Sequence, residues 1–193
     1  MNRRIIFNTP LVFHLFYALA WLGLRLAGWK LKGRPPKVRK FVLIAYPHTS
    51  NWDFPPGLSA CILHRIKVYW LGKDSLFKGP AGPLMKWLGG IPVDRSQAQD
   101  FVQQAIEAFD QSDELVIGVA PEGTRSRVEK WKTGFYHIAV GAEVPIVPGY
   151  LDYPNKELGF LESILPSGDI DKDLIAIKQA YRGIQGKYAD RSQ

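Results

Sequence analysis

The sequence predicts an α/β protein in which a largely parallel central sheet is flanked by helices and preceded by an N-terminal membrane-interfacial helix. Short apolar runs alternate with segments of helical periodicity, and a basic, apolar N-terminus contains no acidic residue. At 193 residues, 46% of them hydrophobic, the chain is long enough to bury one core. We expect a membrane-associating helix and polybasic linker over 1–40 and an α/β domain over 41–193.

The first strand is expected where the apolar residues are uninterrupted, over 41–46. Because proline fits the first turn of a helix but not its interior, the next helix should begin near Pro55 and Pro56 and continue to about Arg65. A second strand is expected at 68–71. The residues between the first strand and the first helix therefore form a strand-to-helix turn.

Strands and helices continue to alternate through the middle of the chain. A short helix is expected at 83–88, before a glycine pair, and apolar residues recur with helical spacing over 97–111. Apolar runs at 115–120 and 144–151 predict two further buried strands, separated by a helix at 133–141. Such alternation implies a largely parallel sheet, whose ligands usually bind beyond the carboxyl ends of the strands.

The C-terminal part of the sequence has a weaker pattern. Beyond Asp152 we expect a loop, a short strand near 158–161 and a terminal helix near 171–188. No internal repeat or low-complexity tract is visible. The chemistry should therefore be sought in the earlier, regular part of the chain.

Positive charge is concentrated at the N-terminus. Residues 1–40 contain nine Lys or Arg and no Asp or Glu, so the remaining 16 basic and 18 acidic residues sum to −2. Seven of the nine lie in 25–40, directly after the apolar stretch 11–24. This order suits insertion into the interface of an anionic leaflet, since apolar burial and phospholipid attraction then act together.

The N-terminal segment has three alternative interpretations. A spanning helix needs about 20 apolar residues, whereas 11–24 supplies fourteen and includes His14. A cleaved signal peptide would use Ala18-Leu19-Ala20 and leave apolar residues exposed behind the cut. An ordinary amphipathic helix would pack on the core. Nucleic acid is excluded as a partner, because the basic excess is confined to this lipid-like segment and no recognition motif accompanies it.

The single cysteine, Cys61, excludes an intramolecular disulfide and is compatible with a reducing compartment. It lies in an apolar helical pattern, which predicts an inert core thiol; the alternative is a nucleophile.

We expect the protein to associate with the cytoplasmic face of the inner or plasma membrane.

The first candidate site is the run His48-Thr49-Ser50-Asn51-Trp52-Asp53. Positions five apart diverge by roughly 140° on a helix, but His48 and Asp53 can meet on a turn. A carboxylate on one imidazole nitrogen selects the tautomer and steadies the imidazolium, as general-base activation of a hydroxyl requires. The structural alternative is that Asp53 caps the helix beginning at Phe54 and Ser50 caps a nearby turn.

The second candidate site is Glu122-Gly123-Thr124-Arg125, directly after the expected strand 115–120. Glycine in such a turn lets the backbone approach an anion, and an arginine fork matches phosphate oxygens. The alternative is an ordinary polar turn with a surface salt bridge.

Two further stretches accompany these sites. Arg95 follows the short run that begins at Gly90, where it could meet the same anion as Arg125 or simply pair with Asp94 or Asp100. The segment 144–148 has no reactive group and can shape a wall. We expect no metal or other cofactor, because the histidines other than His48 do not form pairs at ligand spacing; they are His14, His64 and His137.

The four ordered blocks, over about residues 41–150, resemble the glycerolipid acyltransferase family, whose best-known members are the 1-acylglycerol-3-phosphate (lysophosphatidic acid) acyltransferases. The resemblance implies that His48 is the general base and Asp53 its orienting partner, and Ser50 matches a serine common in the first block. It also implies roles in holding a phosphorylated acceptor for Arg95, Glu122 and Arg125, with Gly123 and Thr124 shaping that loop. The chain departs from the family pattern at Pro47, where asparagine is common, and at Pro92.

The implied reaction moves an acyl group from an acyl-CoA or acyl-carrier-protein thioester to the hydroxyl of a lysophosphatidic acid-like acceptor at a membrane phospholipid surface. Three alternatives are weighed against it: another lysophospholipid or an amino-acid lysolipid as acceptor, a thioester hydrolase in which the same base activates water, and a non-catalytic lipid-binding module.

Overall fold

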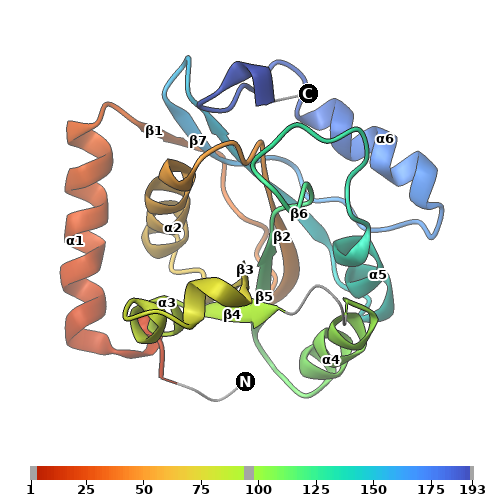
Figure 1. Cartoon of the computed structure of the whole chain (residues 1–193), viewed down its shortest axis with the longest axis horizontal. Helices are drawn as coiled ribbons and strands as arrows, with labels where there is room; N and C mark the ends of the chain where they lie inside the picture. The colour runs from red at the N-terminus through yellow and green to blue at the C-terminus, as the bar shows by residue number, and fades with distance from the viewer. Residues whose placement is uncertain (1–3, 94–97, 192–193) are drawn as a thin grey trace.

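The computed structural model describes residues 4–93 and 98–191, and it confirms the predicted α/β fold (Figure 1). The described strands form one seven-stranded sheet in the order β1-β7-β6-β2-β5-β3-β4, parallel except where β6 pairs with β7. The strands are β1 Lys30–Lys32, β2 Lys40–Tyr46, β3 Val68–Lys73, β4 Gly90–Val93, β5 Leu115–Val119, β6 Ile146–Asp152 and β7 Glu157–Phe160.

Helices cover both faces of the sheet. In Figure 1, α1 and α2 lie on one side, and α4, α5 and α6 lie on the other. The α-helices are α1 Pro10–Leu26, α2 Phe54–Leu63, α3 Gly82–Trp87, α4 Ala98–Asp110, α5 Gly134–Gly141 and α6 Ile170–Ala180. Short 3-10 turns are η1 Ile6–Asn8, η2 Asn51–Asp53, η3 Asp74–Phe77 and η5 Ala189–Arg191.

The strand β2 explains why the sheet is buried on both faces. Side chains alternate along a strand, so Val42 and Ile44 pack into the cluster that includes residues of α4, α5 and α6. Phe41 and Leu43 point the other way, into the cluster that includes residues of α2. A continuous apolar run is therefore what this central, parallel strand requires.

The position of β2 also places the site. It pairs in parallel with β5, with Ile44 opposite Val119. Because parallel neighbours end at the same edge, the turn after β2 and the loop after β5 emerge side by side. The sequence predicted polar motifs on both, and the sheet order brings them together.

The structure differs from the predicted elements in three places. Lys30–Lys32, placed by the sequence in the basic linker, forms β1 by parallel pairing with β7. Gly90–Val93, noted only as a short apolar run, forms the edge strand β4. The terminal helix ends at Ala180, well before Tyr188, and Gly183 beyond it has a left-handed φ of 85°.

The helix α1 is apolar on two opposite faces. Phe13, Ala20 and Leu24 are buried against the body of the protein. Five leucines are exposed, and at 100° per residue they fall within about 80° of one another on the far face; they are Leu11, Leu15, Leu19, Leu22 and Leu26. Among the described residues, the helices include none with the length and hydropathy of a membrane span.

Candidate active site

His48 and Asp53 meet on the strand-to-helix turn, as predicted. The imidazole Nδ1 lies 3.1 Å from Asp53 Oδ2. The carboxylate is buried, with 4% of its side chain exposed, whereas the histidine side chain is 30% exposed. One ring nitrogen is therefore held by a fixed carboxylate, in a ring that substrate can still approach.

The Asp53 carboxylate also organises the backbone of the turn. Its Oδ2 accepts hydrogen bonds from the amides of Thr49 and Ser50, both at 2.8 Å. Its Oδ1 accepts one from the Tyr153 hydroxyl, also at 2.8 Å. Asp53 thus closes a capping box on η2, and it orients His48 at the same time. As the N-cap of α2, Asp53 makes no side-chain capping hydrogen bond, so the expected cap of the helix beginning at Phe54 is wrong; the carboxylate caps the preceding turn instead.

Ser50 caps the same turn, as the structural alternative predicted. Its Oγ accepts a hydrogen bond of 3.1 Å from the amide of Trp52. The amides of Thr49, Ser50 and Trp52 are thus satisfied by side chains within the turn that leads into α2.

Glu122 joins the two loops. Its Oε2 accepts a hydrogen bond of 2.9 Å from the backbone amide of His48. The residue is 4% exposed, and burial together with the nearby Asp53 charge raises its pKa from 4.5 to about 8, while the His48 hydrogen bond opposes the rise. At pH 7 this carboxyl group is largely protonated. The predicted contact of Glu122 with the acceptor stays a prediction; in the structure it supports the histidine.

The glycine of the second motif is required by the backbone. Gly123 has a φ of 63°, a left-handed conformation that L side chains rarely adopt. A Cβ on Gly123 would also lie 2.9 Å from the Lys132 side chain. The turn therefore places Glu122 inward and Thr124 at the surface of the cavity described next.

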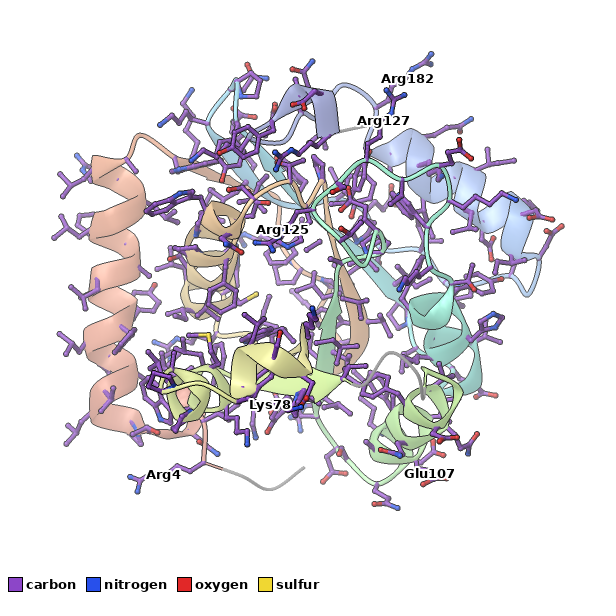
Figure 2. The ribbon with its side chains drawn as sticks, in the orientation of Figure 1. Arg4, Lys78, Glu107, Arg125, Arg127 and Arg182 are labelled. Carbon is purple, nitrogen blue, oxygen red and sulfur yellow. The ribbon has the colours of Figure 1, made fainter. Side chains whose placement is uncertain are left out.

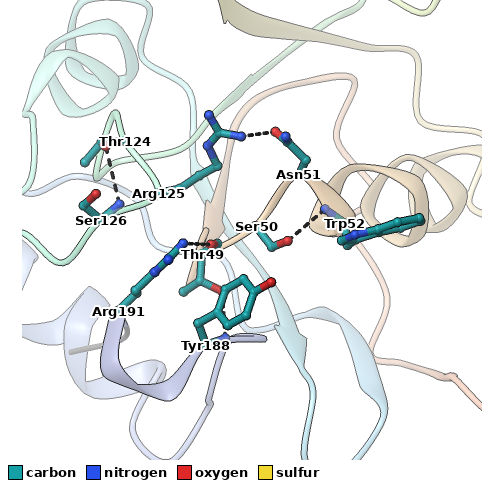
Figure 3. Close-up of a pocket in the computed structure, with 9 residues that line it drawn as sticks. All are labelled: Thr49, Ser50, Asn51, Trp52, Thr124, Arg125, Ser126, Tyr188 and Arg191. Carbon is teal, nitrogen blue, oxygen red and sulfur yellow. Dashed lines mark hydrogen bonds between the residues drawn. The ribbon is translucent and has the colours of Figure 1, made fainter.

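A polar cavity of about 420 Å³ lies beside the histidine turn (Figure 3). Its walls come from the turn after β2, the loop after β5 and the C-terminal segment. Arg125 Nη1 donates to Asn51 Oδ1, and Arg191 Nη1 donates to the Thr49 carbonyl at 3.4 Å. The lining consists of Thr49, Ser50, Asn51, Trp52, Thr124, Arg125, Ser126, Tyr188 and Arg191. Among the described residues, the lining contains two guanidinium groups and no carboxylate, which makes the cavity suited to an anion.

The arginines near this edge differ in orientation. In Figure 2, Arg125 lies within the outline of the molecule between α2 and the loop after β5, whereas Arg127 and Arg182 project at its rim. Of these three, only Arg125 is among the lining residues of the cavity. Predicted Arg95 falls outside the described residues.

Cys61 is buried in α2, and desolvation raises the pKa of its thiol to about 12. A thiol of this kind is almost entirely protonated at neutral pH, which disfavours the nucleophile alternative. Within 4–93 and 98–191, no group of three or more His, Cys, Asp or Glu side chains is arranged to hold a metal ion.

Among the residues that the fold brings to this site and to which sequence reasoning assigned no role are Asn51, Ser126, Tyr153, Tyr188 and Arg191. Asn51 lay inside the first motif, so its proximity was available. Tyr153 is 100 positions from its partner Asp53, and Arg191 is 142 positions from Thr49. The directly preceding buried strand was a signal for Tyr153; nothing in the local pattern indicated Arg191.

Comparison with known proteins shows the class that this fold and site define. A sequence model described as Acyltransferase matches residues 32–152. The chain belongs to the acyltransferase family.

Similar proteins within the family share one name. The 1-acyl-sn-glycerol-3-phosphate acyltransferase of Haemophilus influenzae is 31% identical over 140 residues, which cover 66% of this chain and 57% of that protein. The protein of the same name from Escherichia coli is 32% identical over 108 residues, covering 52% and 42%. The chain thus spans about half the length of these curated relatives.

A solved structure has the same fold. The 1-acyl-sn-glycerophosphate (LPA) acyltransferase PlsC from Thermotoga maritima aligns with a TM-score of 0.60, at 18% identity, over 91% of this chain and 82% of that one. The agreement supports the α/β architecture seen here, including its flanking helices.

Proposed function

We propose that this protein transfers a fatty acyl group from a thioester, either acyl-CoA or acyl-carrier protein, to the hydroxyl of a lysophosphatidic acid-like acceptor in phospholipid synthesis. The observation that carries the proposal is the 3.1 Å contact between His48 and buried Asp53 beside an anion-suited cavity. The relatives of known name act on 1-acyl-sn-glycerol-3-phosphate, which is a lipid with both a free hydroxyl and a phosphate.

The proposed chemistry uses both nitrogens of His48. A neutral ring that donates from Nδ1 to Asp53 leaves the Nε2 lone pair free to take a proton. As Nε2 removes the acceptor's hydroxyl proton, the oxygen attacks the thioester carbonyl and forms the new C–O bond. Collapse of the tetrahedral intermediate breaks the C–S bond, and the imidazolium returns its proton to the departing thiolate. No covalent acyl-enzyme is required.

The cavity supplies the second requirement, which is recognition of the acceptor's phosphate. Arg125 and Arg191 reach it from different segments of the chain, and the cavity begins at Thr49, the residue after the base. His48 is not part of the lining. Base and anion pocket are therefore adjacent but separate, which fits a substrate whose phosphate and reacting hydroxyl are different groups.

The experiment that tests the function is an acyl-transfer screen read by mass spectrometry. Purified protein is supplied with acyl-CoA or acyl-carrier protein and with lysophosphatidic acid, other lysophospholipids or an amino-acid lysolipid. We expect phosphatidic acid as the main product, and a loss of about 10³-fold or more in His48→Ala. His137→Ala serves as the matched control, since that histidine is exposed on α5.

Each other result has a definite meaning. Free fatty acid as the main product would indicate thioester hydrolysis, and acylation of a different lysolipid would change the acceptor. Full activity in His48→Ala would show the proposed mechanism to be wrong. Liposome binding without turnover over the whole panel would support a lipid-binding module instead.

We also propose that the leucine stripe of α1 docks on a lipid surface. Its five exposed leucines lie along one face, and nine basic residues with no acidic ones fall within the first 40 positions. Apolar burial and attraction to anionic lipid would then act at the same segment.

Sedimentation with vesicles tests the docking proposal. Leu15→Ser/Leu22→Ser should reduce binding to anionic vesicles about tenfold or more, because two side chains no longer bury apolar area. Leu76→Ser/Leu84→Ser, which changes exposed leucines on η3 and α3, is the matched control. Equal loss in both double variants would contradict docking through α1.

A further inference from the structure

The hydroxyl of Tyr153 is the partner of Asp53 that lies outside the motif. It donates to Asp53 Oδ1 at 2.8 Å, whereas the other carboxylate oxygen serves the turn and His48. Resting on the proposed function, we infer that Tyr153 is a positioning residue of the His–Asp pair and that Trp29, at the end of α1, holds it in place. The His48–Asp53 pair is thereby coupled to the position of the end of α1.

Hydrogen bonds to both oxygens of Asp53 restrict rotation of its carboxylate. Bonds to Oδ2 alone leave the carboxyl group able to rotate about its Cβ–Cγ bond, and a donor on Oδ1 limits that rotation. Burial, reinforced by the hydrogen bond to Asp53, raises the pKa of Tyr153 further above its usual range, so the hydroxyl remains a donor. A positioned carboxylate keeps the imidazole at a fixed angle to its substrate.

The ring of Tyr153 packs on Trp29. The two rings meet edge to face, with centroids 5.0 Å apart and planes at 85°. Trp29 lies immediately beyond α1, and its amide donates to the Leu24 carbonyl at 2.8 Å, which closes the end of that helix. A shift of the helix end therefore moves the surface on which the tyrosine rests.

The α1–β1 turn carries Trp29, and the β6–β7 turn carries Tyr153. Lys156, in the β6–β7 turn, donates from Nζ to the Ala27 carbonyl at 3.0 Å, and its own carbonyl accepts from the Lys30 amide at 2.8 Å. The Lys156 ammonium also lies 5.9 Å from the centre of the Trp29 ring. The α1–β1 turn and the β6–β7 turn are thus fastened to each other at several points, with Trp29 and Tyr153 between them.

Removal of the hydroxyl alone tests the positioning role. Tyr153→Phe keeps the ring on Trp29 but removes the donor to Asp53, and we expect kcat to fall about tenfold, with KM for both substrates unchanged. Tyr136→Phe is the matched control, because Tyr136 makes the same kind of bond, at 2.8 Å, to buried Asp173. A kcat of Tyr153→Phe equal to that of the control would overturn the inference.

A readout that does not use turnover separates this inference from the proposed function. Nitrogen-15 spectra report whether the His48 ring carries its proton on Nδ1, and hydrogen exchange reports protection of the Thr49 and Ser50 amides. We expect Tyr153→Phe to lose part of the Nδ1–H form and to exchange these amides about tenfold faster, unlike Tyr136→Phe. If the wild-type protein transfers no acyl group, these changes still support positioning; unchanged spectra and exchange refute it.

A double-mutant cycle tests the link to α1. Trp29→Ala should lower kcat about threefold in the wild-type background and have no further effect in Tyr153→Phe, because its influence passes through the hydroxyl. Trp21→Ala, an exposed tryptophan on α1, is the control for loss of an aromatic side chain. Equal effects of Trp29→Ala in both backgrounds would contradict the coupling.

Discussion

The turn after β2 and the loop after β5 meet at one edge of the sheet but are held differently. In the first, Asp53 is buried and satisfies two amides, a hydroxyl and the histidine. In the second, only the start is buried: Glu122 points inward, and Arg125 three residues later is exposed. The proposed reacting group is thus fixed by backbone and burial, whereas the proposed recognition groups sit in solvent. Changes in the buried groups should alter kcat, and changes in the exposed part of the second loop should alter KM.

The largest expected effect is in the buried turn. Asp53→Asn keeps the side-chain shape but replaces one carboxylate oxygen by an amide donor, which favours the wrong tautomer of His48. We expect kcat to fall about 10³-fold. Steady-state assays with lysophosphatidic acid, beside circular dichroism of the folded variant, measure it. A kcat within a few fold of wild type would show that the carboxylate only caps the turn.

The next effect distinguishes two roles for Glu122, the buried residue that connects the loops. Glu122→Ala leaves the His48 amide without its acceptor, and kcat should fall about 30-fold. Glu122→Gln retains an acceptor oxygen, and since the native carboxyl group is largely protonated at pH 7, its kcat should stay within about threefold of wild type.

Kinetics of the two Glu122 variants at pH 7 provide the measurement. Equal, severe loss in both would indicate that the negative charge of Glu122 is needed, and a rise in acceptor KM alone would support direct contact with the acceptor.

The exposed cavity should give smaller effects of the opposite kind. Arg125→Ala and Arg191→Ala should each raise KM for lysophosphatidic acid about tenfold, with little change in kcat, because each removes one charge-assisted contact to phosphate. An acceptor without a phosphate monoester should be much less sensitive. Arg182→Ala is the control, since Arg182 lies outside this cavity. A kcat loss without a KM change would place these arginines in the chemistry.

The last prediction concerns the Glu122→Gln variant, whose activity should change least but whose stability should depend differently on pH. The folded-state pKa of Glu122 is about 8, above its usual 4.5, so the folded protein binds one more proton between these values. The contribution of Glu122 to the free energy of unfolding should therefore fall as pH rises from about 4.5 to about 8. Urea unfolding at pH 5 and pH 9 should show Glu122→Gln gaining a few kcal/mol relative to wild type at the higher pH. An unchanged difference would contradict the raised pKa.

Local patterns in the sequence were sufficient for the elements that contact one another through regular packing. The strand β2 is buried on both faces and therefore needs a continuous apolar run, whereas α4 is buried on one face and therefore needs helical spacing of its apolar residues. Both patterns are visible in the sequence. The meeting of His48 with Asp53 followed from five positions on a turn, and the placement of Glu122 just after a strand followed from the apolar run before it. These inferences needed only periodicity and the rule that ligands bind at the carboxyl ends of parallel strands.

What the tertiary structure decided is which distant segments complete the site. Lys30–Lys32 forms a strand because it pairs with the edge of β7. Tyr153 reaches Asp53 across 100 positions, and Arg191 enters the cavity from the C-terminal segment. The strand before Tyr153 indicates its edge of the sheet but not its partner, and the contact of Arg191 has no local signature in the sequence. Local patterns were enough for the class of fold and for the proposed reacting pair, because both depend on residues near one another in sequence; the fold added the distant groups that contact this pair and the second arginine of the proposed anion pocket.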